Sequence, residues 1–179
     1  MAGNINYYIY SICLVIAFCI LFVLIKLTDR KRILIAFLIL SIPSLILCQT
    51  YFWNYMFNSY VKSYIFSSES YACELEEELK NITIPLPERT VFQAKEDSCS
   101  PFYMTYSSET EFQTFYTIEL SKLKASEFIQ NYQFIQEGVH GQKDRSGFFV
   151  ELTTGSHIVI SFQEKDVNHL AITYVRTIN

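Results

Sequence analysis

Two long apolar stretches open the chain. Residues 7–25 and 33–53 contain no charged side chain, and each is close to the roughly 20 apolar residues that cross a hydrocarbon core of about 30 Å. Residues 1–6 carry no basic side chain, whereas a cleavable signal peptide has its positive charge before the apolar stretch. We therefore expect residues 1–53 to form a retained transmembrane hairpin of two helices.

The segment 26–32, between the two apolar stretches, predicts how the hairpin is oriented. Its basic residues are Lys26, Arg30, Lys31 and Arg32, against the single acidic residue Asp29. Short loops rich in Lys and Arg remain on the cytoplasmic side of a membrane. The turn is therefore expected in the cytoplasm, and both chain termini on the extracytoplasmic side of the cell membrane.

Residues 54–89 are expected to be a juxtamembrane linker that leads into an acidic helix. The acidic run Glu74 to Glu78 contains Leu75 and is followed by Leu79. These two leucines are four residues apart and so would share one face of a helix. Pro85 and Pro87 follow, and the residue before a proline avoids helical geometry. The acidic helix is therefore expected to end before these prolines.

Residues 90–179 are expected to form an extracytoplasmic α+β domain. Ser107 or Ser108 is expected to cap a helix, with Glu111 placed for a capping box. Alternating apolar and polar residues predict strands at 90–94, 102–106, 132–136, 147–152, 157–163 and 170–175. The predicted order is β-β-α-β-β-β-β, an antiparallel sheet with one packing helix and a closing meander.

The charge of the chain limits its possible partners. Of 14 Lys and Arg residues, 10 follow Trp53, as do 17 of the 18 Asp and Glu residues, so this part has a formal charge of −7. An acidic domain is a poor partner for nucleic acid and is repelled by anionic lipid. The expected partners are membrane lipid, through the hairpin, and another membrane or envelope protein.

The five cysteines fall into two groups. Cys13, Cys19 and Cys48 lie in the apolar stretches, where a thiol behaves as a small hydrophobic group. Cys73 and Cys99 are the two that follow the hairpin, and an even pair in an oxidising compartment predicts a disulfide. Two unpaired thiols remain the alternative.

The sequence predicts no catalytic, cofactor-binding or metal site. The apolar stretches contain no ionisable residue of the kind that marks an ion pathway, which argues against transport by this chain alone. No nucleophile motif surrounds Ser146 or Ser156. His157 and His169 begin two neighbouring predicted strands, which suggests a metal site or a pH sensor if they meet. Exposed histidines at strand ends are the preferred interpretation.

These observations favour a non-catalytic role. We expect a two-span membrane protein whose outer domain acts as a protein-interaction or sensing module at the cell surface. One alternative is a small cell-envelope enzyme that uses His157 and His169. Another is an accessory or immunity-type subunit of a membrane complex, in which the paired helices carry the function.

Overall fold

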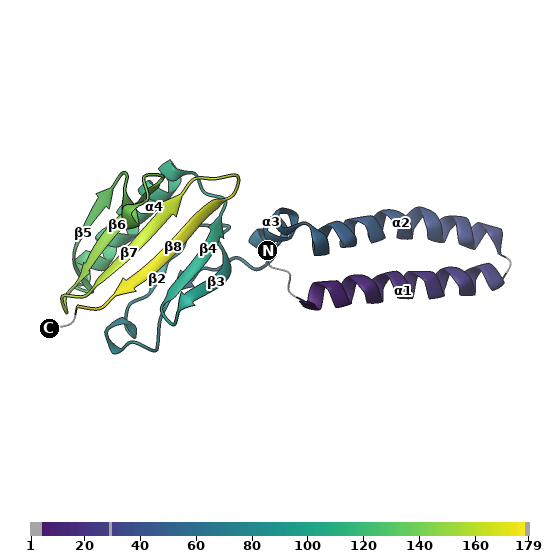
Figure 1. Cartoon of the computed structure of the whole chain (residues 1–179), viewed down its shortest axis with the longest axis horizontal. Helices are drawn as coiled ribbons and strands as arrows, with labels where there is room; N and C mark the ends of the chain where they lie inside the picture. Colours follow the sequence, from purple (N-terminus) through teal and green to yellow (C-terminus); the bar gives the residue numbers. More distant parts are fainter. Residues whose placement is uncertain (1–4, 29, 178–179) are drawn as a thin grey trace. The chain divides into compact units, whose positions relative to one another are not determined.

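The computed structural model describes residues 5–28 and 30–177 of the chain. The chain folds into two compact units, Met1–Val61 and Lys62–Asn179. The first is helical, and the second contains a six-stranded sheet (Figure 1). The predicted α+β class is therefore confirmed, together with an apolar two-helix hairpin before the sheet.

The first unit is built on α1 (Ile5–Leu27) and α2 (Lys31–Trp53). Each has 23 residues and is long and apolar enough to cross a membrane. Both exceed the predicted bounds slightly. Pro43 lies inside α2, and the nearby Ser44 hydroxyl donates to the Leu40 carbonyl at 2.8 Å. A third helix, α3 (Tyr55–Ile65), occupies part of the predicted linker.

Three polar side chains join α1 to α2 near one end of the hairpin. Ser11 Oγ donates to Gln49 Oε1 at 2.5 Å, and Gln49 Nε2 donates to the Ser11 carbonyl at 3.3 Å. The Trp53 indole Nε1 donates to Ser11 Oγ at 2.9 Å. Because an apolar surface offers no other partner for these groups, the bonds fix the register of the two helices.

The second unit has one six-stranded antiparallel sheet in the order β3-β4-β8-β7-β6-β5. Its strands are β3 (Val91–Asp97), β4 (Ser100–Thr105), β5 (Ile129–Ile135), β6 (Arg145–Leu152), β7 (His157–Gln163) and β8 (Asn168–Val175). The predicted three-strand meander is confirmed as β6 to β8; β5 pairs with β6 at one side of it and β4 with β8 at the other. A short 3-10 helix, η2 (Val139–Gly141), lies between β5 and β6.

Helix α4 (Glu109–Ala125) crosses one face of the sheet (Figure 1). Its N-terminus carries the predicted capping box, because Ser108 Oγ accepts from the Glu111 amide and the Glu111 carboxylate accepts from the Ser108 amide. Phe112, Tyr116 and Leu120 recur at helical spacing and are fully buried against the sheet. The core of the unit lies between this helix face and the sheet.

The segment before β3 differs from the prediction. The acidic run is not an α-helix; it contains only the 3-10 turn η1 (Glu77–Leu79), flanked by the paired strands β1 (Ser70–Tyr71) and β2 (Ile84–Pro85). Leu79 is buried in the core whereas Leu75 is 71% exposed, so the two do not share a face. A short isolated helix is marginal in water, and the extended form lets Tyr71 and Ile84 join the core. The packed unit therefore includes residues before Thr90.

Candidate functional site

Cys73 and Cys99 come together as the sequence predicts. Their sulfurs lie at disulfide distance and their Cα atoms are 5.6 Å apart, inside the range that a disulfide requires. Both are buried, and the Tyr71 hydroxyl donates to the Cys99 carbonyl at 2.8 Å beside them. The pair joins the segment before β3 (residues 66–90, here called the lead-in segment) to the turn between β3 and β4. Cys13, Cys19 and Cys48 are free thiols in the hairpin.

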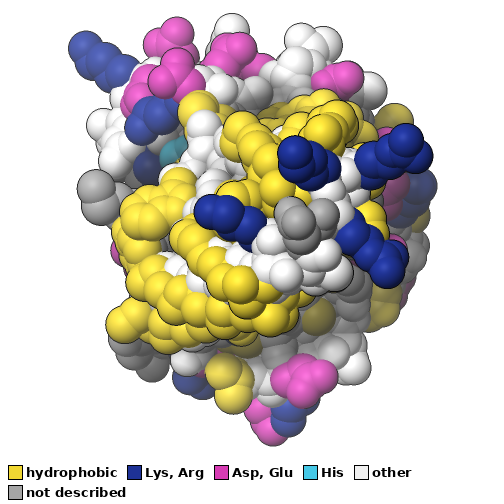
Figure 2. Space-filling view, turned by 90° about the vertical axis from the view of Figure 1, so that its right-hand side faces the viewer, with side chains coloured by type: hydrophobic (Ala, Val, Ile, Leu, Met, Phe, Trp, Pro, Cys, Tyr) yellow, Lys and Arg dark blue, Asp and Glu magenta, His cyan; other side chains and the backbone are white. Residues whose placement is uncertain are grey.

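The four basic residues of the predicted cytoplasmic turn are exposed at the turn end of the hairpin. Lys26 lies in the last turn of α1, Arg30 caps α2, and Lys31 and Arg32 begin it. Figure 2 looks onto the turn end of the hairpin and shows basic side chains among apolar ones. The C-terminal residue Asn179, whose location was predicted from this turn, lies outside the described residues.

The two histidines of the enzyme hypothesis do not meet. In the β7–β8 ladder, His157 is paired with Val175, whereas His169 is paired with Gln163 at the other end. Six residue steps separate the two positions, roughly 20 Å at the rise of a strand. Because neighbouring strands of a meander run in opposite directions, residues that begin each strand lie at opposite ends of the sheet. The alternative in which the two histidines form one site is therefore wrong.

Each histidine instead packs against an aromatic ring. The His157 ring lies 4.6 Å from Phe149 and the His169 ring 5.0 Å from Phe102, measured between centroids. Burial lowers the pKa of His169, and nearby Lys165 and Arg145 lower it further. His169 is therefore neutral at neutral pH, which suits a packing role.

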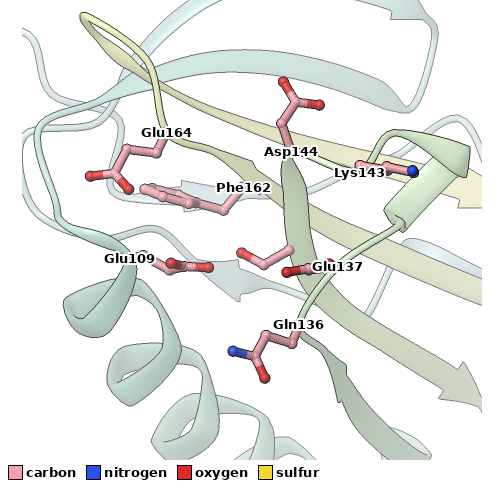
Figure 3. Close-up of a pocket in the computed structure, with 8 residues that line it drawn as sticks. Glu109, Gln136, Glu137, Lys143, Asp144, Phe162 and Glu164 are labelled. Atoms are coloured by element: carbon pink, nitrogen blue, oxygen red, sulfur yellow. The ribbon is translucent and has the colours of Figure 1, made fainter.

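A cavity of the second unit opens beside the N-terminus of α4. It has a volume of about 310 Å³, within the range of small-ligand pockets. Its walls come from the start of α4, the segment after β5, the start of β6 and the end of β7 (Figure 3). The lining residues are Glu109, Gln136, Glu137, Lys143, Asp144, Ser146, Phe162 and Glu164.

The rim of this cavity is strongly acidic. The lining residues include four carboxylates and one ammonium, that of Lys143. Figure 3 shows that the Lys143 side chain points away from the other labelled residues. Within residues 5–28 and 30–177, no ion pair involves any of the four carboxylates. Gln163 donates a hydrogen bond to Asp144, which holds the pKa of that carboxyl below its ordinary value, and Lys165 and Arg145 contribute. Asp144 therefore stays ionised at neutral pH.

The floor of the cavity combines an aromatic ring with a hydroxyl. Phe162 and Ser146 are direct neighbours in the β7–β6 ladder and are 1% and 4% exposed. The Phe162 ring stacks on Phe112 of α4, with centroids 4.9 Å apart. Ser146 Oγ is buried and has no hydrogen-bond partner among the described residues. A buried hydroxyl without a partner is uncommon, and here it lines the cavity.

Sequence reasoning considered Ser146 as a possible nucleophile and did not identify the cavity. Ser156, the other serine considered, accepts a hydrogen bond from the Thr177 amide at 3.3 Å in the β6–β7 turn. The acidic residues of the rim are spread along the sequence from Glu109 to Glu164, and the fold of the unit brings them together. A cluster of Glu137, Lys143 and Asp144 on one connection was the only local signal.

The geometry does not suit a metal ion. Among the described residues, no group of three or more His, Cys, Asp or Glu side chains is arranged to hold one. The carboxylates instead surround a space larger than a single ion.

Comparison with known proteins adds no functional assignment. No protein-family model, no curated protein and no solved structure matches this chain. Any functional proposal must therefore rest on the chemistry of the residues themselves.

Proposed function

We propose that the chain is a two-span membrane protein whose second unit is a non-catalytic protein-interaction or sensing module on the extracytoplasmic side. The surface of the hairpin carries this proposal. Only 6% of the most apolar window of α1 is buried, and none of that of α2. Helices that are apolar all round and unburied need a covering of lipid or of other apolar helices.

The orientation rests on two independent features. The exposed cations Arg30, Lys31 and Arg32 favour a cytoplasmic turn. The cysteine pair at disulfide distance suits an oxidising compartment, which is where a disulfide persists. Both features support an extracytoplasmic position for the second unit.

An interaction role is supported by the shape and charge of the second unit. It offers an open acidic cavity next to α4. It also exposes Phe92, 46% accessible, on the edge strand β3, where unpaired backbone groups can take up another chain. The separation of His157 from His169 removes the geometric basis for the enzyme alternative.

One observation favours the accessory-subunit alternative. A groove of about 220 Å³ runs along the hairpin, and its wall includes the small residues Ala17, Ser41, Ser44 and Cys48. Small side chains let another helix approach closely within a membrane. Replacing the hairpin by an unrelated two-helix hairpin separates the roles: retained partner binding supports the module, and lost binding supports the subunit.

Topology is the first test. A reporter that is active only outside the cytoplasm, fused after Asn179, should be active in whole cells. Reversing the charges of Arg30, Lys31 and Arg32 together should produce mixed orientations, because these cations resist translocation. The matched control reverses Lys62 and Lys80 in the second unit, which should leave the orientation unchanged. An inactive reporter in the unmodified protein would contradict the proposal.

Cross-linking in the native membrane is the second test. A photoreactive residue at the exposed position of Phe92 should capture one defined protein, whereas the same probe at Leu27 in the hairpin turn should not. Capture of the same protein by a chain that lacks the second unit would contradict the interaction role.

A further inference from the structure

We propose that the acidic cavity beside α4 binds an organic cation, an alkylammonium head on an apolar stem. All eight lining residues belong to the second unit, so the site does not depend on how the two units are placed. The inference adds a ligand to the proposed interaction role without depending on it, because cross-linking can capture a protein partner whether or not the cavity binds a cation.

The charge of the rim selects the sign of the ligand. The lining holds the four carboxylates Glu109, Glu137, Asp144 and Glu164 and one cation, Lys143, and no ion pair among the described residues involves any of the four. Arg145 and Lys165, which act on Asp144, lie outside the lining, so acidic groups still outnumber basic ones around the cavity. Like charges around one cavity repel one another, and a cation between them relieves this repulsion. An anionic ligand would meet the opposite effect.

The unpartnered Ser146 hydroxyl indicates that the cavity receives a polar group. It is 4% exposed, lines the cavity and has no hydrogen-bond partner in the part of the chain that the structure describes. A serine hydroxyl can accept a hydrogen bond from an N–H donor. An ammonium group supplies three such donors, enough to reach Ser146 and carboxylates on more than one side of the cavity.

The size and floor of the cavity distinguish an organic cation from a metal ion. A volume of about 310 Å³ accommodates an alkyl chain, and the carboxylates are too spread out to form a metal site among the described residues. Phe162 is the apolar residue of the lining, and its buried ring gives the floor an apolar wall for an alkyl stem. These features together fit the chemistry of a lysine side chain or of a free diamine.

The test uses the full chain in nanodiscs of zwitterionic lipid, because anionic lipid would itself bind cations. Two probes distinguish the sources of the ligand: 1,5-diaminopentane represents a free amine, and an acetylated, amidated Gly-Lys-Gly peptide represents a protein side chain. The neutral control is 1,5-pentanediol, and Ca²⁺ is the metal control. Calorimetry measures affinity, and the amide signals of Gln136 and Ser146 in NMR spectra report the location.

We expect saturable binding of at least one of the two amine probes, and no saturable binding of the diol or of Ca²⁺. The amine probe that binds more tightly shows whether the ligand is a free amine or a lysine side chain. The double substitution Glu109→Gln and Glu137→Gln should weaken amine binding by about tenfold or more, since each removes a charged hydrogen-bond acceptor. Ser146→Ala should weaken it by several-fold. Glu96→Gln, an exposed acidic residue on β3 at the other edge of the sheet, is the matched control and should bind as the unmodified protein does.

Several results would overturn the inference. These are no saturable binding of either amine, equal binding of the diol, preferential binding of Ca²⁺, or equal weakening by Glu96→Gln. Because Glu109 lies in the first turn of α4, the double variant is compared with the single variant Glu137→Gln, whose side chain is exposed and outside any helix or strand. A fully folded Glu137→Gln variant with unchanged affinity also counts against the site.

Discussion

At the scale of single residues, Tyr116 places an unsatisfied hydroxyl in the core of the second unit. It is fully buried, and its hydroxyl has no hydrogen-bond partner among the described residues. Burial raises the pKa of this phenol well above its ordinary value. The hydroxyl therefore stays protonated and contributes a desolvation cost to the folded state.

Tyr116→Phe is therefore expected to raise the free energy of unfolding by about 1 kcal/mol, because it removes a buried polar group that has no partner. Thermal unfolding followed by near-ultraviolet circular dichroism measures the change. The matched control is Tyr71→Phe, which removes a buried hydroxyl that does donate a hydrogen bond, to the Cys99 carbonyl. That variant should lose about 1 kcal/mol. Destabilisation of similar size in both would contradict the argument.

Gly147 is required by the close approach of β6 and β7. A Cβ atom at this position would overlap the Ile160 carbonyl oxygen and come within 3.0 Å of the Ser161 Cα, both backbone atoms of β7. Gly147→Ala should therefore cost about 1–3 kcal/mol of stability, since neither strand can move without disturbing the core. Glu151→Ala on the same strand, where the side chain is exposed, is the control and should cost far less. Chemical denaturation of the three proteins tests this.

At the scale of elements, the carboxylate of Glu78 joins the 3-10 turn η1 to the β6–β7 turn and to β8. Glu78 Oε2 accepts from the Thr154 hydroxyl at 2.9 Å and from the Tyr174 hydroxyl at 3.0 Å. Ser156 is the largest contributor to the lowered pKa of Glu78, followed by Thr154 and Tyr174, with a smaller effect from Arg176. The lead-in segment and the β6–β7 turn are thus linked through an ionised group.

Glu78→Gln is expected to destabilise the protein in a pH-dependent way. A carboxyl whose pKa is lowered on folding contributes stability above its unfolded pKa, and that contribution is lost as the pH falls through the folded pKa. The melting temperature of the variant should therefore lie below that of the unmodified protein at pH 7, and the difference should shrink below pH ~4. The control is Glu77→Gln, whose side chain is 91% exposed. A difference that is constant with pH would exclude the charged hydrogen bonds as its cause.

At the scale of the whole molecule, the cysteine pair closes a loop with a sequence separation of 26 between Cys73 and Cys99. If the bond forms, the double substitution Cys73→Ser and Cys99→Ser should lower the free energy of unfolding by about 3 kcal/mol, from the entropy of the open loop. Urea denaturation with and without a reductant measures this. Cys48→Ser, which removes a free thiol of the hairpin, is the control. Equal stability in oxidising and reducing buffer would show that the bond does not form.

The sequence by itself determined the features that depend on neighbouring residues. The apolar stretches predict α1 and α2, and Ser108 with Glu111 predicts the start of α4, because solvation and capping act within a few residues. Alternation of apolar and polar positions predicts the strands, and short turns predict the meander from β6 to β8. The cysteine pairing followed from counting, since one even pair follows the hairpin.

Only the tertiary structure decided what depends on contacts between distant segments. The pairing of β8 with β4 joins the β3–β4 pair to the rest of the sheet. Leu79 and Ile84 are part of the core, although the acidic run in their segment predicted a helix. The antiparallel register separates His157 from His169. The same strand order brings Glu109 and Glu164 to one cavity. The periodicity of a short segment does not predict such contacts between distant residues. These contacts depend on how much apolar surface the whole assembled unit buries.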